Sequence, residues 1–338
     1  MATYSFSRNS TAPIKFGSWQ VTAININATK RSNQLSVALC IPVRNPGPGV
    51  CALIEGIKNQ TLLPRRILVL DSCSTDGFVE HFSEIGAEFY FVPDGEFDHG
   101  GTRRLGAELL QGVDVVIFLT QDAIPSDSEA FGELIKKFEN PTVGIAFGRQ
   151  LPREKATPLE AHARLFNYPP ESNVKSLRDV SSLGIKSAFA SNSFAAYRQT
   201  ALSDVGSFPK SCIVSEDTYV AGKMLLKGWK IAYCSEAKVY HSHNYSLKNE
   251  CRRYFDIGVF HSREPWVMER FGSAEGEGKR FVVSEIKFIW PGNSFLLPII
   301  FMKTIIKYVG FRMGKIEKIL PLWLKIRLTM HPPFFLKR

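Results

Sequence analysis

Residues 115–123 read Val-Val-Ile-Phe-Leu-Thr-Gln-Asp-Ala, and this stretch decides the fold. A continuous apolar run of this length predicts a strand buried on both faces, the central strand of a parallel sheet. Ligands of open α/β sheets bind outside the carboxyl ends of the strands. Asp122 is therefore expected at the rim of a binding site, within reach of a divalent metal. The alternative is a turn-forming Asp ahead of a helix beginning near residues 126–128.

Strand-like and helical segments alternate through the first half of the chain. Strands are predicted at residues 35–42, 66–71, 87–92, 113–119 and 143–147, and helices at 49–59, 78–85, 102–111 and 131–138. Asn45 is expected to cap the first helix, with Pro46 at its first position. This alternation with short connections predicts a doubly wound α/β sheet.

The pattern loosens after residue 150. Prolines and charges predict a long, mostly irregular segment over 150–180. Further strands are predicted at 187–197, 230–234 and 237–240, and helices at 216–227, 247–260 and 299–320, the first of them ended by Gly228. An edge strand is predicted within residues 19–26.

The net charge of +10 lies entirely in the last 60 residues. Residues 279–338 hold twelve Lys and Arg against two Glu, whereas the first 278 residues hold 30 basic and 30 acidic side chains. Such a tail can meet nucleic acid or an anionic membrane surface. The six cysteines form no Cys-x-x-Cys pair and are expected to be free thiols in a reducing compartment.

No targeting or membrane-spanning segment is expected. Residues 1–33 are polar and lack the apolar core of a secretory signal. The best candidate for a span, Phe288–Met302, has 15 uncharged residues interrupted by prolines, short of the roughly 20 that a bilayer requires.

Four motifs recur in an informative order: Ile41-Pro-Val-Arg-Asn45, Leu70-Asp-Ser-Cys-Ser-Thr-Asp-Gly77, Thr120-Gln-Asp-Ala123 and Glu216-Asp217. With them, residues 35–265 resemble the family 2 glycosyltransferases. Phe97-Asp-His-Gly-Gly-Thr-Arg103 resembles the rhamnosyltransferase branch of that family. The resemblance implies a GT-A fold, a Rossmann-like α/β fold with a mostly parallel central sheet flanked by helices. The expected domains are an N-terminal extension (1–34), the catalytic domain (35–265) and a basic, apolar helical extension (266–338).

The resemblance also implies a site for a nucleotide-sugar donor. Its expected residues are Pro42, Arg44, Asp71, Arg103, Gln121 and Asp122. Asp71 would accept a hydrogen bond from a pyrimidine N3–H, the alternative being an Asx-turn within residues 72–77. Arg103 would brace the nucleotide or Asp71 at a helix start whose backbone N–H groups suit an anion, the alternative being a surface Arg after a glycine turn.

A divalent metal, Mg²⁺ or Mn²⁺, is the expected cofactor. The family motif Asp-x-Asp lacks its first carboxylate here, which leaves Asp122 as the main ligand. His241 and His243 are two apart, so in an extended segment both point to one face, and one of them is expected to act near the metal or diphosphate. A structural histidine is the alternative.

Asp217 is implied as the catalytic base, with Glu216 aligning the acceptor or the helix. The helix dipole is expected to lower the pKa of Asp217 and keep it ionised. The alternative is an acidic residue that only stabilises the helix N-terminus.

The function implied by the resemblance is inverting transfer of L-rhamnose from dTDP-L-rhamnose to a lipid-linked saccharide, in O-antigen-type polysaccharide synthesis. The protein is expected in the cytoplasm, peripheral on the inner face of the plasma membrane, and a homo-oligomer is compatible with the sequence. One alternative is a sugar-nucleotide nucleotidyltransferase, although Gly100-Gly-Thr-Arg103 follows the third predicted strand rather than the first. The other is a scaffold that binds membrane or nucleic acid. Nucleic acid is not expected, because the sequence lacks aromatic–basic interleaving.

Overall fold

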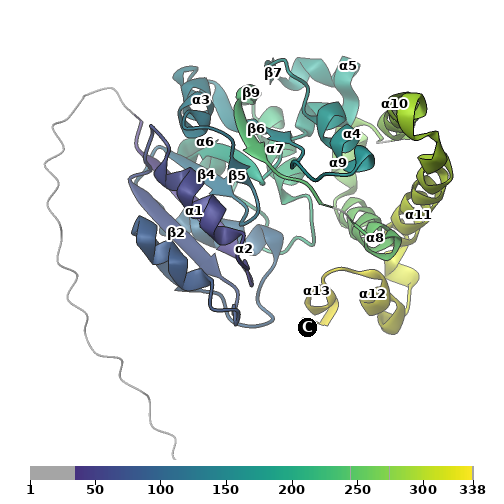
Figure 1. Ribbon diagram of the computed structural model, residues 1–338, viewed down its shortest axis with the longest axis horizontal. Coiled ribbons are helices and arrows are strands. Elements are labelled where there is room, and N and C mark those ends of the chain that lie inside the picture. Colours follow the sequence, from purple (N-terminus) through teal and green to yellow (C-terminus); the bar gives the residue numbers. More distant parts are fainter. Residues whose placement is uncertain (1–34, 244, 274, 337–338) are drawn as a thin grey trace, which may run out of the picture. The chain divides into compact units, whose positions relative to one another are not determined.

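The computed structural model describes residues 35–243, 245–273 and 275–336 (Figure 1). The edge strand predicted within 19–26 lies outside these residues. Residues from Leu35 onward form one compact unit. The proposed division at residues 265 and 266 therefore concerns parts of one compact unit and remains a prediction.

A mixed sheet runs through this unit in the order β3-β2-β1-β4-β8-β6-β9-β5, with β7 paired to β9. The strands are β1 Val37–Val43, β2 Arg66–Asp71, β3 Glu88–Phe91, β4 Val115–Leu119, β5 Ile124–Pro125, β6 Val143–Leu151, β7 Asn173–Lys175, β8 Phe194–Arg198 and β9 Lys230–Tyr240. Strands β3, β2, β1 and β4 are parallel. β4 pairs antiparallel with β8, so it is central but parallel to its neighbour on one side only. The predicted α/β class is confirmed.

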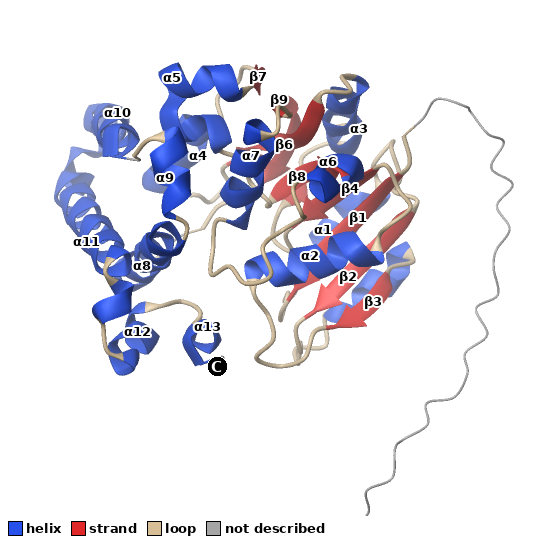
Figure 2. Cartoon of the chain, turned by 180° about the vertical axis from the view of Figure 1, so that it is seen from behind, coloured by secondary structure: helices blue, strands red, loops and turns tan. Residues whose placement is uncertain are grey.

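Helices cover both faces of the sheet (Figures 1 and 2). They are α1 Val50–Lys58, α2 His99–Leu109, α3 Ala130–Lys136, α4 Pro158–Asn167, α5 Val180–Leu183, α6 Gln199–Asp204, α7 Glu216–Leu226, α8 Leu247–Arg263, α9 Pro265–Phe271, α10 Glu275–Asn293, α11 Leu297–Lys315, α12 Leu322–Leu328 and α13 Pro332–Leu336. Helices α1 and α3 share one core with the sheet. Helices α2, α6 and α7 share the core on the opposite face.

Side chains alternate along β4 and contribute to the hydrophobic cores on both faces of the sheet. Val115, Ile117 and Leu119 enter the core of α1 and α3. Val116 and Phe118 enter the opposite core, and all five side chains are fully buried. The predicted doubly buried strand is confirmed, and its carboxyl end delivers Thr120, Gln121 and Asp122 to the sheet rim.

Asn45 does not cap the first helix, which corrects the sequence prediction. Helix α1 begins at Val50 after Gly49, whereas Asn45 has a left-handed backbone with φ 45°. Asn tolerates this conformation better than most residues. Its side-chain oxygen accepts a hydrogen bond from Thr75 N at 2.8 Å, so Asn45 joins the loops after β1 and β2.

Residues 150–180 are more regular than predicted. They contain α4, β7 and the first residue of α5, and a capping box between Thr157 and Glu160 starts α4. Thr-Pro-Leu-Glu at 157–160 is the sequence signal of this helix start. The strand predicted at 187–197 is confined to Phe194–Arg198, and the two short strands at 230–240 are one strand, β9.

Helix α11 packs against α8 at unusually close range. A Cβ on Gly258 would lie 2.3 Å from Phe311 O, and a Cβ on Gly310 would lie 2.4 Å from Cys251 O. Only glycine permits this approach, so these positions fix the crossing of the two helices.

The region Gly276–Lys315 is long and apolar enough to span a membrane by length and composition, and 11% of its most apolar window is buried. The region is divided between α10 and α11 at Ser294–Leu296, with Pro291 inside α10 and Pro298 in the first turn of α11. Length and composition alone do not establish a membrane span, so the expectation that no segment spans a membrane stays a prediction.

Candidate active site

Asp122 meets two histidines from a distant part of the sequence, His241 and His243, beyond the end of β4. Nε2 of His241 lies 3.4 Å from Oδ2 of Asp122, and Nε2 of His243 lies 3.5 Å from the same oxygen. Ligand atoms of the three residues all lie within 4.8 Å of one another. His241 is buried, while Asp122 and His243 are partly exposed. This is a carboxylate–imidazole cluster that can hold one divalent ion.

Gln150 at the end of β6 sets the tautomer of His241. Its Oε1 accepts from Arg164, a residue that can only donate, and its Nε2 donates to Ser191 Oγ at 2.8 Å. His241 Nδ1 lies 2.9 Å from the same Oε1, so Nδ1 carries the proton. In the neutral ring, Nε2 then turns a lone pair toward Asp122. Histidines that bind metal are oriented by an outer hydrogen bond of this kind.

The ionisation states around Asp122 suit a cation. Burial lowers the pKa of His241, and burial lowers that of His243 to about 4, so both rings are neutral near pH 7. Burial of Asp122 opposes its ionisation, but protonated histidines beside it would donate a hydrogen bond and supply charge that hold its pKa below the usual range. An ionised carboxylate and two neutral imidazoles are the protonation states that a metal requires.

The predicted donor residues other than Arg103 lie at the ends of β1, β2 and β4. Gln121 Oε1 accepts from Arg44 N at 2.7 Å, and Gln121 Nε2 donates to Arg44 O at 3.1 Å. The Gln121 side chain thereby holds the start of the loop after β1, directly beyond Pro42 and Val43 at the end of that strand. The Arg44 side chain is exposed and lies 3.7 Å from Asp94. This arrangement leaves Arg44 accessible to a ligand.

Asp71 at the end of β2 is buried and makes the turn that the sequence offered as an alternative. Its carboxylate accepts from Ser74 Oγ at 2.5 Å and from Ser74 N at 3.1 Å. These bonds involve mainly Oδ1. Oδ2 therefore retains accepting capacity, and the turn does not exclude contact with a base.

Asp217 and Glu216 open α7 at a strained residue, Ser215, whose φ is 63°. Glu216 is buried, pairs with Arg103 Nη1 at 3.0 Å and accepts from Asn192 Nδ2 at 2.7 Å. Asp217 accepts from Thr218 N at 2.7 Å and keeps part of its side chain accessible. The two carboxylates thus differ, because the charge of Glu216 is compensated by Arg103 and Asn192, whereas Asp217 has no cationic partner of its own among the described residues and is only partly exposed.

The pKa of Asp217 is raised, whereas the sequence analysis expected the helix dipole to lower it. Burial raises it to about 7, and the neighbouring Glu216 charge adds to the increase. Together, burial and the Glu216 charge outweigh the hydrogen bond from Thr218 N, which favours the ionised form of Asp217. A carboxylate with a pKa near the working pH is suited to accept a proton.

Arg103 is neither a surface residue nor bound to Asp71. It is 4% exposed, and besides Glu216 its Nη1 donates to His99 O at 3.1 Å. The carboxylate of Asp98 caps α2 by accepting from Gly101 N at 2.7 Å, which fills the position predicted for an anion. A Cβ on Gly100 would lie 2.5 Å from Pro209 O, so this glycine serves packing rather than phosphate binding. The resemblance to a nucleotidyltransferase loop therefore fails.

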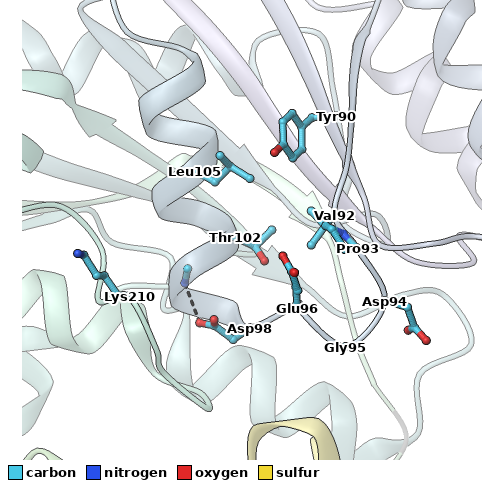
Figure 3. Close-up of a pocket in the computed structure, with 11 residues that line it drawn as sticks. Tyr90, Val92, Pro93, Asp94, Gly95, Glu96, Asp98, Thr102, Leu105 and Lys210 are labelled. Atoms are coloured by element: carbon cyan, nitrogen blue, oxygen red, sulfur yellow. Dashed lines mark hydrogen bonds between the residues drawn. The ribbon is translucent and has the colours of Figure 1, made fainter. Parts of the chain in front are cut away.

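A hollow of about 650 Å³ lies beside α2 and contains none of the predicted site residues (Figure 3). It is lined by Tyr90, Val92, Pro93, Asp94, Gly95, Glu96, Asp98, Gly101, Thr102, Leu105 and Lys210. Three carboxylates against one lysine disfavour an anionic ligand such as a nucleoside diphosphate.

Sequence reasoning missed the residues that orient this site. Gln150, Asn192 and His99 act through hydrogen bonds to His241, Glu216 and Arg103. Arg153 Nη2 donates to Asp122 O at 2.6 Å. Gln150, Asn192 and Arg153 lie 91, 24 and 31 residues from their partners, so no local pattern reports these contacts. His99 lies one helical turn before Arg103, and that spacing was readable from the sequence.

Comparisons with known proteins identify the family of the chain. The profile of glycosyl transferase family 2 matches residues 38–206. The chain is 44% identical over 289 residues to the O-antigen chain rhamnosyltransferase RfbN of Salmonella typhimurium, covering 85% of this chain and 92% of that protein. It is 42% identical over 288 residues to the O-antigen chain rhamnosyltransferase WbaN of Salmonella anatum, covering 85% and 91%.

A solved structure shares the fold. It is the mannosyltransferase PcManGT from Pyrobaculum calidifontis in complex with GDP-Man and Mn²⁺, which matches with a TM-score of 0.56 over 84% of this chain and 89% of that one, at 15% identity. The family profile spans half of the chain, and two relatives exceed 40% identity over most of it. The chain therefore belongs to glycosyl transferase family 2 and is a glycosyltransferase.

Proposed function

We propose that this protein transfers L-rhamnose from dTDP-L-rhamnose to a hydroxyl of a lipid-linked saccharide during O-antigen-type polysaccharide synthesis, with inversion at the anomeric carbon. The observation that carries the proposal is the cluster of Asp122, His241 and His243 at the end of β4. The choice of sugar is supported by two relatives named O-antigen chain rhamnosyltransferases.

The donor would lie across the ends of β1, β2 and β4. Asp71 Oδ2 would accept from the pyrimidine N3–H, and the loop that Gln121 holds would present Pro42 and Arg44 to the nucleotide. Arg153 and Arg164 add positive charge beside Asp122, where the diphosphate would lie. Arg103 is assigned to Glu216 rather than to the donor.

The donor atoms of the Asp122 cluster fit a divalent ion. An ionised carboxylate and a neutral imidazole that face each other through lone pairs at 3.4 Å repel unless a cation lies between them. Such an ion would neutralise the charge that develops on the leaving diphosphate. Two imidazoles favour Mn²⁺ over Mg²⁺, because Mg²⁺ prefers oxygen ligands.

Asp217 would act as the general base. It takes the proton of the acceptor hydroxyl as that oxygen bonds to the anomeric carbon. The bond from the anomeric carbon to the phosphate oxygen breaks at the same time, and dTDP departs with the electron pair. Attack opposite to the leaving group inverts the configuration. Glu216 stays ionised and paired with Arg103, which keeps the start of α7 in place.

The C-terminal helices would place the enzyme on the inner face of the plasma membrane. Phe301, Ile305 and Tyr308, at helical spacing on α11, are each more than half exposed. Trp290, Phe295 and Trp323 on neighbouring elements are still more exposed. An apolar helical face of this size on a basic extension suits the interface of an anionic bilayer, where it meets a lipid-linked acceptor.

Two lysines of α11 face the protein rather than a lipid surface. Lys303 and Lys307 each lie 3.9 Å from Glu250 of α8 and are mostly buried. Exposed basic residues on the same helices and the elements next to them include Lys287, Arg312, Lys318 and Arg327. Apolar insertion therefore carries more of the proposed attachment than charge does.

The proposal is tested by incubating the purified protein with Mn²⁺, a lipid-linked acceptor and each of dTDP-L-rhamnose, GDP-mannose and UDP-glucose. Sugar transfer from dTDP-L-rhamnose alone supports it. Transfer only from another donor would exclude rhamnose while leaving the family assignment intact.

A further inference from the structure

The last residues of the chain return to the catalytic face. The link between α12 and α13, residues 329–331, packs against α8 (Figure 2). Thr329 Oγ1 donates to Asp256 Oδ1 at 2.6 Å, and Met330 N donates to Oδ2 of the same residue at 2.9 Å. Both Asp256 and Thr329 are buried. Two hydrogen bonds to one buried carboxylate therefore hold the link in one place.

This link delivers His331 to the start of α2. Nε2 of His331 lies 3.3 Å from Nε2 of His99, and the two rings are perpendicular with centroids 4.8 Å apart. On its other side, His99 Nδ1 lies 3.4 Å from Arg103 Nη1. Arginine can only donate, so His99 accepts at Nδ1 and carries its proton on Nε2. His99 then donates to His331, which fixes the direction of the chain of hydrogen bonds.

The chain of contacts ends beside the proposed base. Arg103 Nη1 contacts Glu216 at 3.0 Å, and Glu216 immediately precedes Asp217. Arg103 Nε has no hydrogen-bond partner among the described residues, so the contacts of Nη1 with Glu216 and His99 position the guanidinium. A change in the position of His99 would therefore displace Arg103 and weaken its ion pair with Glu216, the residue next to Asp217.

We propose that His331 is a positioning residue of the transfer reaction, which accepts the hydrogen bond of His99 and thereby keeps Arg103 against Glu216. The inference rests on the proposed role of Asp217 as the base. With Arg103 in place, the negative charge of Glu216 is compensated and Asp217 can ionise. Without it, two adjacent carboxylates oppose each other's ionisation. The carboxyl-terminal link thus becomes part of the catalytic machinery rather than of the membrane extension alone.

The test compares three full-length variants. His331→Leu keeps the size of the side chain but cannot accept a hydrogen bond, His331→Gln can accept through Oε1, and Leu336→Ala changes an exposed residue of the same segment. We expect His331→Leu to lower kcat on the order of 10-fold, as for other residues that orient a site, with donor KM unchanged. We also expect the acidic limb of its kcat profile to move to higher pH by at least ~0.5 unit. His331→Gln should restore most of kcat and the profile, and Leu336→Ala should match wild type.

Two results would overturn the proposal. One is a His331→Leu protein whose kcat and pH profile equal those of wild type. The other is an equal loss of kcat in the Leu and Gln variants with no shift of the pH profile, which would indicate a purely structural role. Asp217→Asn is measured in parallel: if it retains wild-type turnover, the base assignment fails, whereas an inactive Asp217→Asn beside a normal His331→Leu defeats only the role of His331.

Discussion

Oδ2 of Asp122 and Nε2 of His241 lie 3.4 Å apart with a lone pair on each atom. The hydrogen bond from His241 Nδ1 to Gln150 fixes this arrangement, because it places the only proton of the neutral ring on the far side. Two acceptors at this distance are stabilised by a cation between them. Gln150, at the end of β6, therefore determines which nitrogen of His241 carries the proton and which one faces Asp122.

The first prediction concerns the metal. We expect the protein to bind Mn²⁺ more tightly than Mg²⁺ and Asp122→Ala to lose most of this binding, together with metal-dependent binding of dTDP. The melting temperature without ligand should change little, because Asp122 lies at the rim of the sheet and few packing contacts are lost. Mn²⁺ titration by electron paramagnetic resonance measures the first effect and calorimetry with dTDP the second, with the exposed His81→Ala as a matched control. Equal dTDP affinity in wild type and Asp122→Ala, with or without EDTA, would contradict the ligand role.

The second prediction tests whether Gln150 orients the His241 ring, without changing any of the three metal ligands. Gln150→Leu removes the acceptor that holds the His241 tautomer but leaves all three ligands in place. We expect Mn²⁺ affinity to fall by roughly 10-fold or more, as for other outer hydrogen bonds at metal sites. The same titration measures it, and affinity equal to wild type would show that Gln150 does not orient the ring.

The third prediction concerns Asp217. Asp217→Asn should keep donor binding but lose at least ~100-fold in turnover, the contribution of a general base. Its stability at pH 8 should rise, on the order of 1 kcal/mol, because the variant no longer holds a partly buried charge beside Glu216. Chemical denaturation and single-turnover kinetics test the two effects, and wild-type turnover in this variant would remove Asp217 from the mechanism.

The fourth prediction is the pH dependence that follows from the raised pKa of Asp217. Below about pH 7 the carboxyl keeps its proton, so kcat should rise with pH and level off above that value. The same group lowers stability as pH rises from about 4 to 7, because the folded state binds a proton that the unfolded state has released. A kcat profile already flat from pH 5 would contradict this assignment.

The fifth prediction concerns the apolar face of α11. Ile305→Asp should reduce co-sedimentation with anionic vesicles strongly, since the side chain is 63% exposed and would carry charge into the lipid. Lys303→Gln should have a smaller effect because Lys303 faces Glu250. Binding that is lost at high salt but is unaffected by Ile305→Asp would favour charge over insertion.

Local sequence patterns were sufficient for much of the fold. The doubly buried run of β4 and the helical spacing of α1 predicted those elements, because each pattern reports burial directly. The capping box of α4, Thr157 and Glu160, is also readable from the sequence, although prolines surround it. The antiparallel position of β8 was not readable, because pairing depends on contacts between strands far apart in sequence.

The candidate site was also predictable from the sequence only in part. Asp122, Asp217 and the two histidines could be named because each follows a recognisable motif or strand. The raised pKa of Asp217 could not be predicted from its position at a helix start, since the Glu216 charge and burial outweigh the dipole. The roles of Gln150 and His331 depend on contacts across 91 and 232 residues, which no local pattern reports.

The most direct test of the account is the stereochemistry of the product. Purified protein, Mn²⁺, dTDP-L-rhamnose and a lipid-linked saccharide acceptor are combined, and the new linkage is examined by nuclear magnetic resonance. The account predicts a rhamnosyl product whose anomeric configuration is opposite to that of the donor, formed by wild type and not by Asp217→Asn. A product that retains the donor configuration, or equal product from the Asp217→Asn protein, would contradict it.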